Sequence, residues 1–501
     1  MRRILAMMAS MALAACSHVD PAARLAEAKA AFAAEDYDHA RIAVLAALEV
    51  QGDNREMLLL LARAELALGD GEGAARTLAR LSDGGMHGSD WNELSAQAAL
   101  LRGQSDAMAR LLGADQGPVA WRLRGEAAQA AGDMVAARAD FQRGTAAGAD
   151  FRLAWDYGRM LIDADDIDGA DRALAVMRQA GPDRLDTLMT AGLIAERRGQ
   201  MDRAMQAYAG AANRYATRPE PLLAMADLAD RYGDLAHAAG YAAQAAARAP
   251  DVPAVVSMTV RIADEQGQWD KVRALMAPHE AALDLHGPDA LAYADALRHL
   301  GRTEAARAIA QQALSLSPQN PKIRLLLAQC DIDLGDGAGA LRTIRPLADS
   351  VLAGKPELDL AIRAATLARD GALAGYVARR NAPQLATINA ASMAAMAAMA
   401  RRDWAAALTL WRTIPGAEGD AEVQKLMALT ASRLGQGDAA IGYADRALAL
   451  DSTNPDMLHM AGVVRLNAGR DPETSRSLLH QALERDPTNH LFRADYARAG
   501  G

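Results

Sequence analysis

The stretch from Pro219 to Pro250 contains two successive helical patterns of apolar residues, separated by the dipeptide Gly233-Asp234. The first pattern places Leu222, Met225, Ala226 and Ala229 on one face, and the second places Leu235, Ala238, Ala242 and Ala245 on one face. Apolar residues spaced three and four apart share a face of an α-helix, and a Gly-Asp pair favours a chain reversal. The stretch therefore predicts two helices joined by a tight turn, with a stop at Pro250.

The same pair of helical patterns recurs along nearly all of the 501 residues. The residue at the break marks each copy, and the fourteen break residues are Glu35, Gly69, Gly103, Gly132, Asp165, Gly199, Gly233, Gly267, Gly301, Gly335, Arg369, Arg402, Gly435 and Gly469. Of the thirteen spacings between them, nine are 34 residues, three are 33 and one is 29. A constant period of this length is typical of helical repeat arrays, in which each repeat packs only on its neighbours.

Two positions of every copy are reserved for small side chains. Five residues after the break, eleven of the fourteen copies have alanine, and seven residues before it all copies except two have alanine or glycine. Two helices that cross closely leave no room for a large side chain at the crossing point. Glycine in mid-helix costs roughly 1 kcal/mol relative to alanine. We therefore expect tight contacts at the four glycines of the second position, which are Gly125, Gly158, Gly192 and Gly462.

With these features the chain resembles the tetratricopeptide repeat (TPR) family, whose unit is a helix-turn-helix of 34 residues. The resemblance covers residues 20–486; Trp121 and Gly125 match the opening signature of the family, and Pro182, Pro250 and Pro318 match its terminal proline. It implies an all-α fold, a right-handed α-solenoid of about fourteen TPR-like helix-turn-helix repeats. Residues 487–501 follow as a short polar helix that we expect to cap the array.

Composition agrees with a helical array, because apolar residues make up 51% of the chain and aromatic residues only 4%. The apolar share is rich in alanine and leucine, which favour helices over strands. A net charge of −9 without a basic stripe argues against nucleic-acid binding.

The first residues resemble an export signal. Arg2 and Arg3 precede an apolar run at residues 4–15, which is too short to span a bilayer. The run ends in Leu13-Ala14-Ala15-Cys16, which resembles the lipobox of bacterial lipoproteins. The resemblance implies a signal peptide at residues 1–15, a lipidated tether at residues 16–19 that begins with Cys16, and, from Ser17, an outer-membrane destination. The alternative is cleavage at the small-residue site Ala12-x-Ala14, which would leave a soluble exported protein.

Motifs for catalysis and cofactors fail on spacing. The aspartates between Asp163 and Asp171 lack the closing glutamate of a calcium loop, and the glycine-rich turns lack the Gly-Lys-Ser/Thr of a phosphate loop. No His-Glu-x-x-His, Cys-x-x-Cys or Gly-x-Ser-x-Gly motif occurs. We therefore expect no enzyme activity, cofactor, metal or small-molecule substrate, and a lone, buried, inert thiol at Cys330.

The resemblance also nominates binding residues. In the family the first helix of each pair lines a concave groove, and residues three, six and ten before the break point into it. The positions so nominated are Arg122, Glu126, Trp155, Arg159, Asp227, Asp230 and Arg298. Met393, Met396 and Met399 add a methionine row at helical spacing, which suits an adaptable apolar site, although core packing is the favoured explanation.

These observations predict a lipid-anchored scaffold of the bacterial cell envelope that binds protein partners. Lipoproteins of this kind assist in the assembly of a pilus, a secretion machine or a polysaccharide exporter, and a pilus or secretion role is expected first. Two alternatives remain open at the level of the sequence. One is an envelope enzyme or binding protein for glycans, with the solenoid as a cradle, and the other is a soluble periplasmic adaptor.

Overall fold

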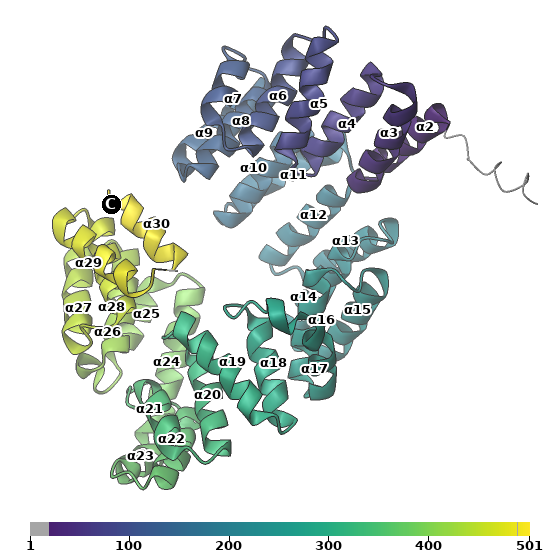
Figure 1. Cartoon of the computed structure of the whole chain (residues 1–501). Coiled ribbons are helices and arrows are strands. Elements are labelled where there is room, and N and C mark those ends of the chain that lie inside the picture. The colour runs from purple at the N-terminus through teal and green to yellow at the C-terminus, as the bar shows by residue number, and fades with distance from the viewer. Residues whose placement is uncertain (1–19, 488, 501) are drawn as a thin grey trace, which may run out of the picture. The chain divides into compact units, whose positions relative to one another are not determined.

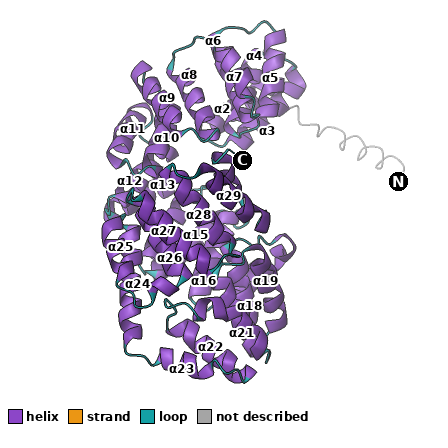
Figure 2. Ribbon diagram, turned by 90° about the vertical axis from the view of Figure 1, so that its left-hand side faces the viewer, coloured by secondary structure: helices purple, strands orange, loops and turns teal. Residues whose placement is uncertain are grey.

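The computed structural model describes residues 20–487 and 489–500. The expected signal peptide and Cys16 lie outside these described residues. Within them the chain forms α-helices and two short 3-10 helices joined by tight turns, without a strand (Figure 2). The chain divides into two compact units, one up to Met225 and the other from Ala226 onward.

The helices follow one another in pairs, as Figure 1 shows by label and colour. In the first unit they are α2 (Pro21–Ala33), α3 (Tyr37–Gln51), α4 (Arg55–Ala67), α5 (Gly71–Asp83), α6 (Ser89–Leu101), α7 (Ser105–Leu112), α8 (Pro118–Ala130), α9 (Met134–Ala147), α10 (Phe151–Asp163), α11 (Ile167–Ala180), α12 (Leu185–Arg197) and α13 (Met201–Arg214). The boundary between the units falls within α14 (Glu220–Arg231).

The second unit continues the same alternation of first and second helices. Its helices are α15 (Leu235–Arg248), α16 (Pro253–Glu265), α17 (Trp269–Met276), η1 (Ala277–Ala282), α18 (Pro288–His299), α19 (Thr303–Leu316), α20 (Pro321–Asp333), α21 (Gly337–Ala348), α22 (Lys355–Ala368), α23 (Leu373–Arg380), α24 (Gln384–Ala400), α25 (Trp404–Arg412), η2 (Ala417–Gly419), α26 (Ala421–Arg433), α27 (Gly437–Leu450), α28 (Pro455–Ala468), α29 (Pro472–Arg485) and α30 (His490–Arg498). The helices α2 to α29 make fourteen pairs, and α30 follows them, so the expected all-α repeat fold is confirmed.

The break residue of each repeat ends the first helix in a left-handed conformation. All fourteen break residues have a positive φ, between 53° and 82°. At Gly233 (φ 77°) the next amide, that of Asp234, donates to the carbonyl of Ala229 at 2.9 Å, which closes the first helix. The Asp234 carboxylate then accepts from the amide of His237 at 3.1 Å and so caps the second helix. The Gly-Asp pair thus both ends one helix and starts the next.

The small-residue positions lie at the helix crossings, as expected. Ala204, Ala238 and Ala306 are fully buried. A Cβ atom on Gly125 would lie 2.7 Å from Phe141, and one on Gly192 would lie 2.2 Å from Tyr208. These glycines therefore make room for a large side chain of the partner helix.

Two repeats depart from the expected register. Ala374 and Thr474, which stand five residues after a break, are exposed, while Tyr376 and Ser475 are buried. The second helix begins two residues after Gly233, at Leu235, but four residues after Arg369, at Leu373, and three residues after Gly469, at Pro472. The longer turns move the crossing point along the second helix, so the prediction for Ala374 and Thr474 was wrong.

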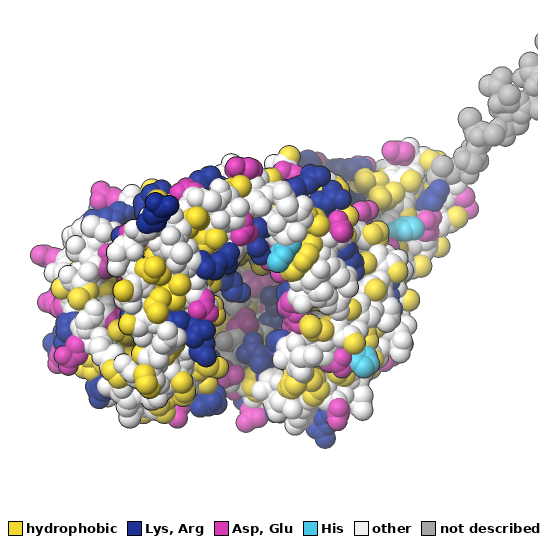
Figure 3. All heavy atoms as spheres, turned by 90° about the horizontal axis from the view of Figure 1, so that it is seen from below, with side chains coloured by type: hydrophobic (Ala, Val, Ile, Leu, Met, Phe, Trp, Pro, Cys, Tyr) yellow, Lys and Arg dark blue, Asp and Glu magenta, His cyan; other side chains and the backbone are white. Residues whose placement is uncertain are grey.

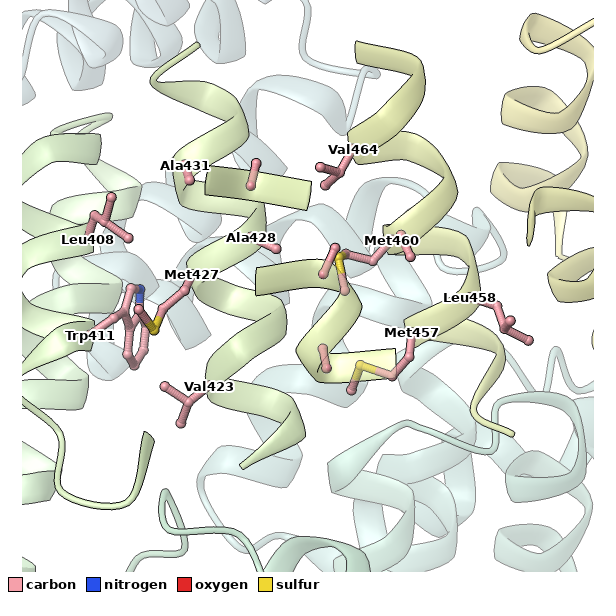
Figure 4. Packing of buried hydrophobic residues seen from close by; sticks show 14 of the residues in the cluster. Leu408, Trp411, Val423, Met427, Ala428, Ala431, Met457, Leu458, Met460 and Val464 are labelled. Carbon is pink, nitrogen blue, oxygen red and sulfur yellow. The ribbon is translucent and has the colours of Figure 1, made fainter. Parts of the chain in front are cut away.

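The buried apolar residues form a series of local clusters along the chain, as expected where each repeat packs on its neighbours. The largest cluster described lies in the last repeats and is shown in Figure 4. Trp411 of α25 is fully buried beside Met427 of α26, and the small side chains of Ala428 and Ala431 line the same helix. The cluster thus combines large side chains of α25 and α26 with alanines of α26.

Candidate binding groove

A hollow in the second unit runs along four consecutive first helices, α16, α18, α20 and α22. Its volume is about 650 Å³. The residues that line it are Arg261, Asp264, Glu265, Pro288, Asp289, Leu291, Ala292, Asp295, Arg298, Lys322, Leu325, Leu326, Gln329, Pro356, Asp359, Leu360 and Arg363. We refer to this hollow as the groove.

Repeat register decides which side chains reach the groove. The residue six before the break lines it in all four repeats, and these residues are Arg261, Asp295, Gln329 and Arg363. Asp264 and Arg298 come from the position three before the break, and Leu291, Leu325 and Asp359 from the position ten before it. Since these positions share one face of a helix, a 34-residue repeat sets them in parallel rows.

At the start of these rows one arginine is held by two aspartates. Arg261 of α16 is 3.0 Å from the carboxylate of Asp227 and also pairs with Asp230, both on the preceding first helix, α14. Asp227 is in turn 3.0 Å from Arg231. Two of the nominated residues, Asp227 and Asp230, are therefore already neutralised by arginine.

A second network crosses the later helices. Arg298 is 3.0 Å from Asp295 on its own helix and 3.2 Å from Asp333 on α20. Arg363 of α22 donates to Gln329 at 3.1 Å and lies 3.6 Å from Asp333. The nominated residue Arg298 therefore lies in the groove and links two repeats.

Asp264 lies between these two networks and belongs to neither. Its Oδ1 atom is buried and has no hydrogen-bond partner among the described residues. Burial, with a smaller contribution from the charge of Asp295, raises the pKa of Asp264 to about 6. The carboxylate of Asp264 therefore has no arginine partner in the groove, whereas that of Asp295 pairs with Arg298.

The four nominated residues of the first unit lie apart from this groove, on α8 and α10. The side chain of Arg122 is only 5% exposed, because it pairs with Glu126 and lies 3.9 Å from Asp156. Burial raises the pKa of Asp156 to about 7. Since Arg122 and Glu126 neutralise each other inside the first unit, the guanidinium of Arg122 offers little surface to a partner.

Trp155 and Arg159 form a different arrangement on α10. The guanidinium groups of Arg152 and Arg159 lie 4.1 Å and 4.8 Å from the centre of the Trp155 ring. Such contacts between a cation and an aromatic face hold the indole in place. Arg159 itself is exposed and half-buried Trp155 packs on the core of the unit.

The methionine row lies on α24, a helix of 17 residues without a charged side chain. Met393 is 73% exposed and Met396 is 51% exposed, so core packing does not account for either. Met399 packs against the cluster of the last repeats. The row is therefore divided between surface and core.

Sequence reasoning named only Arg298 among the residues that line the groove. It missed Arg261, Asp264, Asp295, Leu291 and Leu325. The same offsets of three, six and ten residues, applied to the breaks at Gly267, Gly301, Gly335 and Arg369, would have found them.

Other chemistry is sparse in the part of the chain that the structure describes. Cys330 is free and fully buried, as expected, and burial raises the pKa of its thiol to about 12. Residues 20–487 and 489–500 hold no group of three or more His, Cys, Asp or Glu side chains placed to hold a metal ion. None of the described helices combines the length and the apolar character needed to cross a bilayer. On the face seen in Figure 3, basic and acidic side chains are interspersed.

Several solved structures resemble the chain. One is the crystal structure of the APC/C hetero-tetramer Cut9-Hcn1, with 15% identity, 96% of each chain covered and a TM-score of 0.38. Another is the structure of Naa15/Naa10 bound to HypK-THB, with 13% identity, 96% of this chain and 65% of that chain covered and a TM-score of 0.28. PilF of Pseudomonas aeruginosa shows 16% identity over 48% of this chain and 95% of its own, with a TM-score of 0.32. Likenesses at these scores carry no argument about function.

Comparison with curated proteins gives no match. Two stretches do match family models that are described as tetratricopeptide repeat, residues 25–85 and residues 297–351. The first stretch covers α2 to α5, and the second runs from the end of α18 through α21. The chain therefore contains tetratricopeptide repeats at these two stretches, within one series of helix pairs that continues from α2 to α29.

Proposed function

We propose that the protein is a scaffold that captures a segment of a partner protein in the groove of its second unit. The observation that carries this proposal is the row of groove side chains from four consecutive first helices, in which Leu291 and Leu325 lie between charged residues. Stacked helices hold these side chains in fixed positions before a partner arrives, which lowers the ordering cost of binding. An extended or helical peptide is the ligand that such a continuous surface suits.

We further propose that the scaffold is anchored in the bacterial cell envelope by a lipid on Cys16. Support comes from the sequence alone, from the basic start, the short apolar run and the Leu13-Ala14-Ala15-Cys16 pattern. A lipidated cysteine would hold the array at a membrane surface. The resemblance to envelope lipoproteins favours a role in the assembly of a pilus or secretion machine, with the protein on the periplasmic side of the outer membrane.

Site-specific photo-crosslinking in intact cells tests the groove. A benzophenone amino acid is placed at Leu291 or at Leu325, which are half-buried in the groove, and at Gln311 as a control, which is exposed on the second helix α19. We expect a distinct protein adduct from both groove positions and none from Gln311. Equal labelling from all three positions, or labelling of glycan alone, would overturn capture of a partner protein.

Metabolic labelling with a radioactive fatty acid tests the anchor. The natural chain is expected to take up label and to require detergent for release, whereas Cys16→Ser is expected to do neither. An unlabelled natural chain that leaves the membrane without detergent would instead indicate a soluble periplasmic adaptor.

A further inference from the structure

In the groove, the carboxylate of Asp264 has no arginine partner, unlike the carboxylates of the neighbouring helix steps. At the step from α14 to α16, Arg261 bridges Asp227 and Asp230, and at the step from α18 to α20, Arg298 bridges Asp295 and Asp333. Between these steps, α16 presents Asp264 and α18 presents Asp295. The charge of Asp295 acts on Asp264 as a repulsion. Like charges on neighbouring helices are unfavourable unless a positive charge comes between them.

The basic side chains of the groove do not fill this place. Arg261 and Arg298 each have two carboxylate partners on their own networks. Lys322 stands in the first turn of α20. In that repeat the residue that corresponds to Asp264 is Ile332, ten residues after Lys322. Ten residues of helix correspond to about 15 Å, so Lys322 lies far along the groove from Asp264.

Two features of Asp264 make its site receptive to a cation. Its buried Oδ1 atom has no hydrogen-bond partner among the described residues, so the chain itself does not offset the charge of this carboxylate, and the residue lines the groove. Asp264 is also the last residue but one of α16, where the carbonyl end of the helix carries partial negative charge. Both features favour a positive group that brings its own hydrogen-bond donors.

Apolar surface adjoins this acidic site within the same groove. Leu291 and Leu325 are half-buried and lie on α18 and α20, one repeat apart. They offer contacts to aliphatic side chains or to the methylene stem of a lysine or arginine.

Resting on capture of a peptide by the groove, we propose that the partner segment carries a lysine or arginine flanked by apolar residues. The cation is seated between Asp264 and Asp295, and the apolar residues lie on Leu291 and Leu325. The groove would then have an alternating row of charge from α14 to α22, with the partner supplying the one missing member.

Selection from a phage-displayed library of random peptides tests this proposal on the purified chain. Three forms are compared: the natural chain, Asp264→Asn, and the matched control Asp270→Asn. Asp270 belongs to the same repeat as Asp264, but it is exposed in the first turn of the second helix, α17, and does not line the groove. Helical circular dichroism and thermal melting verify that all three forms are folded before selection.

We expect the natural chain and Asp270→Asn to enrich peptides with a basic residue at one fixed position between apolar ones. Asp264→Asn is expected to bind such a peptide about tenfold more weakly, because a hydrogen bond to a charged group is lost. Enriched peptides without a basic preference, or equal affinity for Asp264→Asn, would overturn this inference and leave peptide capture intact. If no peptide is enriched on the natural chain, both the inference and capture of a peptide by the groove fail.

Discussion

The guanidinium of Arg184 donates from Nε to the Glu35 carboxylate at 2.8 Å, although 149 residues separate the two in the chain. Arg184 immediately precedes α12, and Glu35 is the break residue of the first repeat, with a φ of 62°. The guanidinium also lies 3.8 Å from the centre of the Phe151 ring. Within the first unit this contact joins the first repeat to the sixth, which begins five repeats later.

Replacement of Arg184 by glutamine should loosen the first repeat. We expect a loss of about 1 kcal/mol, the upper range for a partly exposed ion pair, because the Glu35 carboxylate is only 13% exposed and would lose its charged partner. Hydrogen exchange of amides in α2 and α3 should report the change. The control is Arg198→Gln, since Arg198 pairs with exposed Asp168 within neighbouring repeats, and its replacement should leave α2 and α3 protected. Unchanged exchange in Arg184→Gln would show that the contact does not hold the first repeat.

The 34-residue period of the sequence and the positions of its small residues were sufficient to predict the helices, the turns and most of the helix crossings. The 34-residue spacing of the breaks predicts the turn at Gly233, and the small residues predict a tight contact at Gly192, which the structure shows to be with Tyr208. The contact of Arg184 with Glu35 was beyond sequence reasoning, because it depends on small rotations that accumulate over several repeats. The shift at Ala374 escaped for a related reason, since turn length there is set by the residues that follow Arg369.

The positions that line the groove could be predicted from the sequence, but the ion pairs among their side chains could not. The offsets that nominated Arg298 also lead to Asp264, and nothing in the sequence distinguishes the paired carboxylate of Asp230 from the unpaired one of Asp264. That difference depends on which helix step brings an arginine within reach.

The ionised carboxylate of Asp264 should lower the free energy of unfolding at neutral pH. Its pKa of about 6 in the folded chain lies above the ordinary value near 4, so the folded state disfavours the ionised form. The cost is present above about pH 6 and disappears as the pH falls towards 4. We expect Asp264→Asn to raise the free energy of unfolding by about 1 kcal/mol at neutral pH, a value reduced for solvent screening, and to leave it unchanged near pH 4.

Urea denaturation at both pH values checks this expectation, and Asp166→Asn provides the control of opposite sign. The amide of Gly169 and the guanidinium of Arg138 lower the pKa of Asp166. Its ionised form therefore adds stability above the unfolded pKa and loses it as the pH falls, so Asp166→Asn should destabilise at neutral pH. A lower urea midpoint for Asp264→Asn at neutral pH would contradict the unpaired state of its carboxylate.

Replacement of Arg369 by glycine should stabilise the protein. Arg369 is exposed and ends α22 with a φ of 53°, a conformation that costs a non-glycine residue about 1 kcal/mol. We expect Arg369→Gly to raise the thermal midpoint. The reverse change, Gly335→Ala, is the control, because Gly335 has a φ of 82° and open space around its Cα. Gly335→Ala should lower the free energy of unfolding by a similar amount, through backbone strain alone. Equal thermal midpoints for the two variants would argue against left-handed helix caps as a source of stability.

Two glycines at the same repeat position should respond in opposite ways to alanine. Both Gly158 and Gly192 stand seven residues before a break, in mid-helix, where alanine is favoured by roughly 1 kcal/mol. A Cβ atom on Gly158 would meet Ala173 at 3.4 Å, an ordinary contact, so Gly158→Ala should stabilise the first unit. A Cβ atom on Gly192 would lie 2.2 Å from the Tyr208 ring, which is buried and whose hydroxyl donates to Glu196 at 3.1 Å.

Because Tyr208 is buried and its hydroxyl is hydrogen-bonded, its ring cannot move away without breaking that hydrogen bond or opening the crossing. Gly192→Ala should therefore destabilise by about 1–3 kcal/mol, as overpacked cores do. Urea midpoints of Gly158→Ala and Gly192→Ala, compared with that of the natural chain, test both expectations. The double change Gly192→Ala with Tyr208→Leu should recover part of the loss, since a smaller side chain vacates the space that the new methyl group needs. A midpoint for Gly192→Ala above that of the natural chain would mean that the crossing has room to spare, and that glycine there is not required by packing.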